Sequence, residues 1–141
     1  MKMRFAVAAA AAASLLAGQA LAADTVLRAS LSGAYEKPSR ADPRGSGRVK
    51  VTIKDEKQVC WDLQTKDLPG ATAAHIHRGG PNEAGSVAVA LTPPDSNGHS
   101  QGCARVTAGV GRDLAADPRG YYVNVHTPAF PAGAIRGQLG N

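Results

Sequence analysis

The sequence is short of aromatic residues and of cysteine, and outside its first residues it lacks any long apolar run. Only 4% of the 141 residues are aromatic, and only two are cysteines. After residue 22 no apolar run approaches the ~18 residues of a membrane-spanning helix, so we expect no membrane span there. No strict repeat of a collagen-like or coiled-coil rod occurs. With 43% hydrophobic and 19% charged residues, the composition is that of an ordinary globular domain rather than a long disordered chain.

Several catalytic signatures are also missing. There is no G-x-S-x-G elbow of a serine hydrolase, and no glycine loop that ends in Lys-Ser or Lys-Thr to hold a phosphate. No pair of carboxylates occupies strand positions that would present it to a sugar. Basic and acidic residues are interleaved, and Trp61 and Phe130 make no stacking platform with them. We therefore expect neither serine-hydrolase chemistry nor nucleic-acid binding.

Residues 1–22 have the pattern of a secretory signal peptide. Lys2 and Arg4 supply a basic start, residues 5–18 an apolar centre, and residues 20–22 an Ala-Leu-Ala cleavage site. We expect this segment to be removed, leaving one domain over 23–141 that is periplasmic or secreted. The chain has a formal net charge of +5, which becomes milder once the two basic residues of the signal are removed.

Alternation of apolar and polar residues with a period of two dominates the remainder and predicts short half-buried strands. Clusters of Gly, Pro, Asn or Asp separate about eight such segments, which lie at 26–31, 48–54, 59–64, 75–77, 86–91, 102–106, 121–126 and 135–139. Only 107–116 has helical character, weakened by two glycines. An Ala-Asp-Pro-Arg-Gly sequence occurs at 41–45 and again at 116–120, where it predicts a turn into a strand. The pattern predicts an all-β sandwich or small barrel with little helix.

Cys60 and Cys103 both fall on the polar side of their predicted strands. An oxidising compartment favours their pairing, so we predict a disulfide that lies outside the main core. The alternative is a pair of free thiols.

Histidine gives the clearest sign of chemistry. In His75-Ile76-His77, both imidazoles lie on one face of a strand, about 6.6 Å apart at the backbone. His126 ends a second strand on its polar face. If the two strands are neighbours, the rings can converge on a metal ion. Neutral imidazole suits copper, zinc, nickel or iron, and the order of divalent affinities places copper highest. His99 lies in a loop at 96–100 and becomes a fourth ligand only if that loop folds over the site. The alternative is that these histidines only bind loop backbones.

Three ordered motifs give the sequence a family resemblance. Ala-His-Ile-His-Arg-Gly at 74–79, Tyr-Tyr-Val-Asn-Val-His-Thr at 121–127 and Phe-Pro-Ala-Gly-Ala-Ile-Arg-Gly-Gln-Leu at 130–139 resemble the CHRD (chordin) domain family. The resemblance extends over about residues 26–140. It implies an Ig-like β-sandwich in an exported protein. Animal members lie within chordin, an extracellular antagonist that sequesters a growth factor, and bacterial members are separate exported domains.

The sequence also has a more distant similarity to copper/zinc superoxide dismutases, which are Greek-key sandwiches with an H-x-H copper strand. His75 and His77 match that motif, and His126 matches the later copper ligand. Arg136 lies where those enzymes carry a catalytic arginine that guides the anionic substrate. No aspartate that would bind zinc follows the motif, so the similarity implies copper rather than zinc.

Two functional hypotheses follow from these patterns. In the first, the exported sandwich binds a copper-like ion through His75, His77 and His126, for copper handling or for superoxide dismutase-like catalysis. Arg136 and Arg78 would then raise the anion concentration near the ion. In the second, the protein is a non-enzymatic module that binds an extracytoplasmic protein or a glycan, and its histidines are structural.

Overall fold

The chain folds into an all-β domain, as its alternating pattern predicts. A computed structural model describes residues 23–37 and 41–141, so the predicted signal peptide at 1–22 lies outside the described residues. The described strands are β1 (Thr25–Ser32), β2 (Ser46–Lys54), β3 (Gln58–Lys66), β4 (Ala73–Arg78), β5 (Val87–Leu91), β6 (His99–Arg105), β7 (Tyr121–Thr127) and β8 (Phe130–Gln138). One helix, α1 (Ala108–Ala116), and two 3-10 turns, η1 (Gly33–Tyr35) and η2 (Pro118–Gly120), complete the described elements. No described helix has the length and apolar character that crossing a membrane requires.

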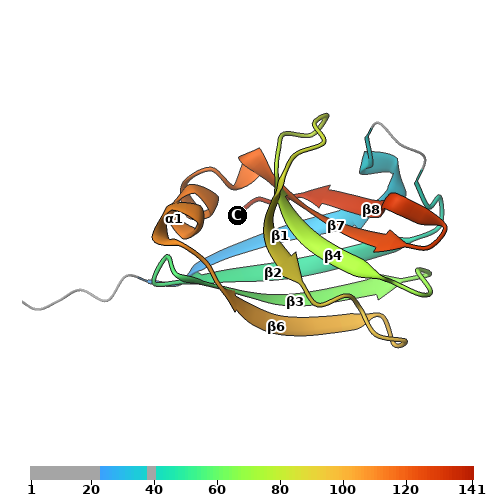
Figure 1. Ribbon diagram of the computed structural model, residues 1–141, viewed down its shortest axis with the longest axis horizontal. Helices are drawn as coiled ribbons and strands as arrows, with labels where there is room; N and C mark the ends of the chain where they lie inside the picture. Colours follow the sequence, from blue (N-terminus) through green and yellow to red (C-terminus); the bar gives the residue numbers. More distant parts are fainter. Residues whose placement is uncertain (1–22, 38–40) are drawn as a thin grey trace, which may run out of the picture.

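The strands form one antiparallel sheet that folds over on itself. Their order is β5-β4-β7-β8-β1-β2-β3-β6, and the two halves of this sheet lie over each other (Figure 1). The halves join where β1 and β8 meet, through the register pair Ser32 and Arg136 and an isolated bridge between Arg28 and Gly140. The result is a sandwich of eight strands, which confirms the predicted fold class.

The core lies between the two halves and consists of the apolar members of each alternating strand. Leu27, Val51 and Leu63 face it from β1, β2 and β3, and Ile76 and Val123 face it from the other half, all fully buried. Burying one such side chain stabilises the fold by roughly 1.5–3 kcal/mol, so this face holds the two halves together.

Helix α1 lies at one end of the sandwich (Figure 1). The Thr107 hydroxyl accepts a hydrogen bond from the Val110 amide as the N-cap, and Leu114 is fully buried. Gly111 allows the helix to approach the turn after β2, because a Cβ there would lie 2.0 Å from the Glu56 carbonyl oxygen. The glycine that weakens the helix locally is therefore required for its packing.

Both Ala-Asp-Pro-Arg-Gly segments form turns that lead into strands, as predicted. In the first, an oxygen of Asp42 accepts hydrogen bonds from the amides of Arg44 and Gly45, just before β2. In the second, Asp117 accepts from the Gly120 amide, just before β7. The aspartate side chain therefore closes each turn.

A disulfide joins Cys60 to Cys103 across 43 residues of sequence. The two residues face each other directly in the pairing of β3 with β6. Cys60 is half-buried and Cys103 is exposed, so the bond lies on the outer face of the sheet. This confirms the predicted pairing and its position outside the core.

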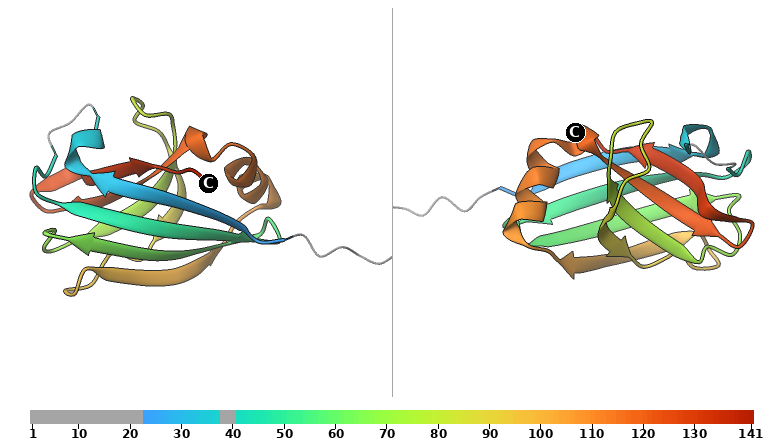
Figure 2. Two further views of the ribbon diagram at one scale, coloured as in Figure 1. Left: turned by 180° about the vertical axis from the view of Figure 1, so that it is seen from behind. Right: turned by 45° about the horizontal axis from the view of Figure 1, so that its top comes forward.

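The outer face of β7 departs from the simple alternating pattern. The alternating pattern predicts that Tyr122 and Asn124 are exposed to solvent, but each is only 3% exposed. The loop 79–86 between β4 and β5, which projects from the sandwich in Figure 2, covers this face, and the segment that follows η1 packs beside it. A second, polar layer therefore forms on the outside of the β4-β7-β8 half.

Candidate metal centre

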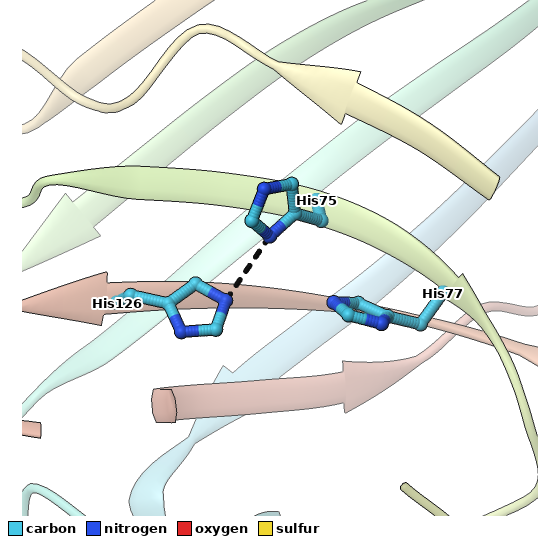
Figure 3. A group of neighbouring side chains, drawn as sticks. All are labelled: His75, His77 and His126. Atoms are coloured by element: carbon cyan, nitrogen blue, oxygen red, sulfur yellow. Dashed lines mark hydrogen bonds between the residues drawn. The ribbon is translucent and has the colours of Figure 1, made fainter. Parts of the chain in front are cut away.

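The pairing of β4 with β7 brings three histidines together (Figure 3). His75 and His77 lie on the outer face of β4, and His126 lies opposite Ala73, two residues before His75. Nδ1 of His75 is 3.1 Å from Nε2 of His126. The ring centroid of His75 is 5.3 Å from that of His77 and 5.0 Å from that of His126. The strand adjacency that the metal hypothesis needed is therefore present.

The spacing of the ring nitrogens is close to that of a metal site. One nitrogen from each of His75, His77 and His126 lies within 4.8 Å of the other two. Nitrogens bound at about 2.0 Å to a common ion are separated by at most about 4 Å. Small rotations of the rings would therefore bring all three into bonding distance of one ion.

Backbone carbonyl groups orient two of the rings. Nδ1 of His77 lies 2.9 Å from the Gly85 carbonyl oxygen, and Nδ1 of His126 lies 2.9 Å from that of Pro131. Because a carbonyl only accepts, Nδ1 of each ring donates its hydrogen there, and in a neutral ring Nε2 carries the lone pair. Nε2 of His126 faces Nδ1 of His75 and Oδ1 of Asn124, each 3.1 Å away. Nε2 of His77 is buried and has no hydrogen-bond partner among the described residues. Carbonyl bonds of this kind fix histidine ligands in metal sites.

The surroundings favour neutral imidazoles at His75 and His77. Burial lowers the pKa of His75 below its ordinary value of 6.5, and the neighbouring His126 and His77 lower it further. Burial also lowers the pKa of His77, against the opposing effect of its bond to Gly85. A neutral ring keeps the lone pair that a metal ion needs, so both residues are ready to bind at neutral pH.

Tyr122 supports His77 from one side. The two rings are parallel within 1°, with centroids 4.9 Å apart. The Tyr122 hydroxyl accepts a hydrogen bond from the Gly85 amide, and the carbonyl of that same glycine accepts from His77. The ring and the hydroxyl of Tyr122 therefore position His77 together.

Arg136 is buried, whereas a residue that guides an anion is expected to be exposed to solvent. It is only 1% exposed, and its guanidinium lies 3.3 Å from the centroid of the Tyr122 ring. Its two terminal nitrogens donate to the carbonyls of Glu83 and Gly80. These bonds attach the loop 79–86 to β8. Because it is almost fully buried and two of its nitrogens are bonded to the loop, Arg136 holds the covering loop in place.

Asn124 and Glu36 fill the space next to the histidines. The Asn124 side chain lies 3.1 Å from Nε2 of His126. Burial raises the pKa of Glu36 to about 7, although Arg136 and hydrogen bonding from Asn124 lower it. Gly133 leaves room for this carboxyl group, since a Cβ there would lie 2.5 Å from Oε1 of Glu36. A buried, partly protonated acid therefore lies within the same polar layer.

Tyr122, Asn124 and Glu36 were not predicted from the sequence as site residues. A signal existed for the first two, because they share the polar face of their strand with His126. Glu36 lies in a non-repetitive segment, so no periodicity pointed to it.

The remaining candidate residues lie elsewhere. His99 is on β6, where its Nε2 lies 3.2 Å from the Asp62 carboxylate, and it is not part of the histidine group. The loop before it does not bring it to the site, so it supplies no fourth ligand. Arg78 forms an ion pair with Asp113 and donates to the Tyr121 hydroxyl. Its guanidinium is therefore bonded to side chains of α1 and β7.

Comparison with known proteins agrees with the fold and with the three ordered motifs. The family profile of the CHRD domain matches residues 27–139, which is most of the chain. Among curated proteins, no relative matches this sequence. The match includes both histidine-bearing strands and Arg136, and it confirms the resemblance drawn from the motifs. The chain therefore belongs to the CHRD domain family.

Proposed function

We propose that this CHRD domain binds a copper-like ion through His75, His77 and His126. The observation that carries the proposal is the orientation of His77 and His126 by backbone carbonyls. Each of these two rings is bound to a carbonyl through Nδ1. Nε2 of His77 has no hydrogen-bond partner among the described residues, and Nε2 of His126 faces Nδ1 of His75 at 3.1 Å. Histidines that served only to lock loops would not need their second nitrogens within 4.8 Å of one another.

The ligand chemistry favours copper. The group contains only imidazoles, without a carboxylate or thiolate among its members. Neutral imidazole suits copper, zinc, nickel and iron, and the order of divalent affinities places copper highest. His75 and His126 are half-buried, so an ion can reach them from solvent.

Binding and handling of the ion fit the geometry better than superoxide dismutation. Dismutation at the ion needs an open path for an anion and a positive group that attracts it. Arg136, the residue expected in that role, is buried and bonded to the loop 79–86. We therefore propose a non-catalytic copper-binding protein of the periplasm or exterior, and the disulfide supports that location.

Copper titration of the purified protein tests the proposal. Electron paramagnetic resonance with one equivalent of Cu(II) should show nitrogen hyperfine structure from imidazole ligands. The single variants His75→Ala, His77→Ala and His126→Ala should each weaken copper binding by about tenfold or more. His99→Ala is the matched control, because it removes an exposed histidine on β6 and should leave binding unchanged. Equal weakening by His99→Ala, or no nitrogen signal in the unaltered protein, would refute the site.

A superoxide-consumption assay separates handling from catalysis. We expect the copper-loaded protein to consume superoxide no faster than an equal concentration of copper-histidine complex. A rate well above that reference, lost in His126→Ala, would replace the handling proposal with an enzymatic one.

A further inference from the structure

The outer face of the other half of the sandwich carries a groove that the metal site does not use. It encloses about 880 Å³ over β1, β2 and β3. Pro81, from the loop 79–86, and Arg119, from η2, line it together with the strands. The same loop that covers the histidine face therefore borders a second hollow.

Basic side chains from separate elements meet in this groove. Arg28, Arg48, Lys50 and Arg119 all line it, and all are exposed. Arg28 and Lys50 lie directly opposite each other in the pairing of β1 with β2. Like charges at directly opposed positions destabilise a sheet, so their presence here indicates a role other than folding.

These charges are not matched by ion pairs, although Asp62 lies opposite Lys50 in the pairing of β2 with β3. Among the described residues, none of the four basic side chains takes part in an ion pair. Asp62, the only carboxylate that lines the groove, lies 3.2 Å from Nε2 of His99. The groove therefore presents a concentrated positive field to solvent, where an anionic ligand gains most.

The hollow continues beyond the strands. A neighbouring hollow of about 440 Å³ shares Ser30, Pro81 and Gln138 with the groove. It adds two further cations, the exposed Lys37 and the buried Arg136, and the aromatic ring of Tyr35, which is 56% exposed. Together the two hollows extend from the strands to Tyr35 and Lys37 and offer several separate cations, which suits a chain with repeated acidic groups better than a small anion.

We propose that this surface binds an anionic polysaccharide that carries carboxylate or sulfate groups. The basic side chains would pair with the acidic groups, and Ser30, Gln64 and Gln138 line the groove with groups that hydrogen-bond sugar hydroxyls. Tyr35 is the one aromatic side chain along the surface, too few for the successive stacking that single-stranded nucleic acids need. No large apolar side chain other than Tyr35 is exposed along it, so a membrane surface does not fit.

Binding of defined oligosaccharides tests the inference. Isothermal titration would use a heparin oligosaccharide for sulfate, a polygalacturonate oligosaccharide for carboxylate, and a dextran oligosaccharide as the neutral reference. We expect at least one anionic oligosaccharide to bind, more weakly as salt rises, and the neutral one not to bind. The double variant Arg28→Gln/Lys50→Gln should weaken that binding by about tenfold or more.

A second double variant separates a built groove from general positive charge. Lys54→Gln/Arg105→Gln removes the same charge from exposed positions of β2 and β6 that do not line the groove. It should weaken binding less than about twofold, with thermal unfolding confirming that both variants fold. Equal weakening by both double variants would overturn the inference. So would the absence of binding by either anionic oligosaccharide, or equally tight binding of polyglutamate or a single-stranded oligonucleotide.

Discussion

The two outer faces of this sandwich have the same alternating sequence pattern but opposite environments. On the β4-β7-β8 half, the loop 79–86 covers the polar side chains, and Asn124 and Arg136 are almost fully buried. On the β1-β2-β3 half, the polar side chains stay exposed, and Arg28 and Lys50 line an open groove. On the covered half, the histidine rings are oriented and neutral. On the open half, the basic side chains stay charged and exposed to solvent. Four changes test this contrast, and their expected effects decrease from the first to the last.

Arg136→Met should produce the largest loss of stability. It leaves the carbonyls of Gly80 and Glu83 without their donors, and it removes the cation beside Glu36. We expect the free energy of unfolding to fall by about 4 kcal/mol, as measured by urea denaturation. On the open face, Arg48→Met should change it by less than about 0.5 kcal/mol. Similar losses for the two arginines would mean that an arginine on the covered face contributes no more to stability than one on the open face.

Removing the disulfide should cost stability without affecting the metal site. The double variant Cys60→Ser/Cys103→Ser releases a constraint across 43 residues on the open half. We expect a loss of about 3 kcal/mol in the free energy of unfolding, measured by thermal and urea denaturation. The copper resonance spectrum should stay unchanged, because the bond joins β3 to β6, away from the histidines. A changed spectrum would show that the two halves are coupled.

The pH dependence of stability should reveal the buried Glu36. Its pKa is raised from 4.5 to about 7, so the unfolded chain loses this proton at lower pH than the folded protein does. Stability is therefore greatest below pH 4.5 as far as Glu36 is concerned, and falls by roughly 2–3 kcal/mol as pH rises to 7. The lowered pKa values of His75 and His77 act in the opposite direction, because they reduce stability as pH falls below 6.5.

Glu36→Gln isolates the carboxyl group from the histidines. Between pH 4.5 and 7, the unaltered protein should lose the stability that Glu36 contributes, whereas the variant should not. The difference between their free energies of unfolding therefore measures the effect of this one carboxyl group. Urea denaturation across this pH range measures it. Parallel pH profiles for the two proteins would contradict the raised pKa.

Tyr122→Phe should give the smallest effect. It keeps the ring stacked on His77 but removes the acceptor of the Gly85 amide. We expect a loss of about 1 kcal/mol in stability and a decrease of about tenfold in copper affinity. Tyr35→Phe, on an exposed residue of the open surface, should change neither quantity. Unchanged copper affinity in Tyr122→Phe would show that Gly85 holds His77 without its help.

Much of the fold could be predicted because each strand has a clear period of two. The pattern located all eight strands, since Val51, Trp61 and Val123 must face a core wherever that core lies. The disulfide could also be predicted, as Cys60 and Cys103 were the only candidates for pairing. The environment of Tyr122 and Asn124 could not, because burial on the polar face depends on a loop from another part of the chain.

The candidate site was only partly predictable for the same reason. The H-x-H spacing puts His75 and His77 on one face of any strand, but the neighbour of that strand is a property of the topology. The burial of Arg136 could not be predicted, because similarity to an enzyme family compares positions in the sequence and says nothing about burial.

The sequence by itself determined the strands, the helix and the strand face to which His75, His77 and His126 belong, because these depend on local periodicity. The tertiary structure alone decided that β4 and β7 are neighbours and that the loop 79–86 covers one half. It also decided that carbonyls from Gly85 and Pro131 reach the rings. These are contacts between residues distant in sequence, and no local pattern encodes which distant groups will meet.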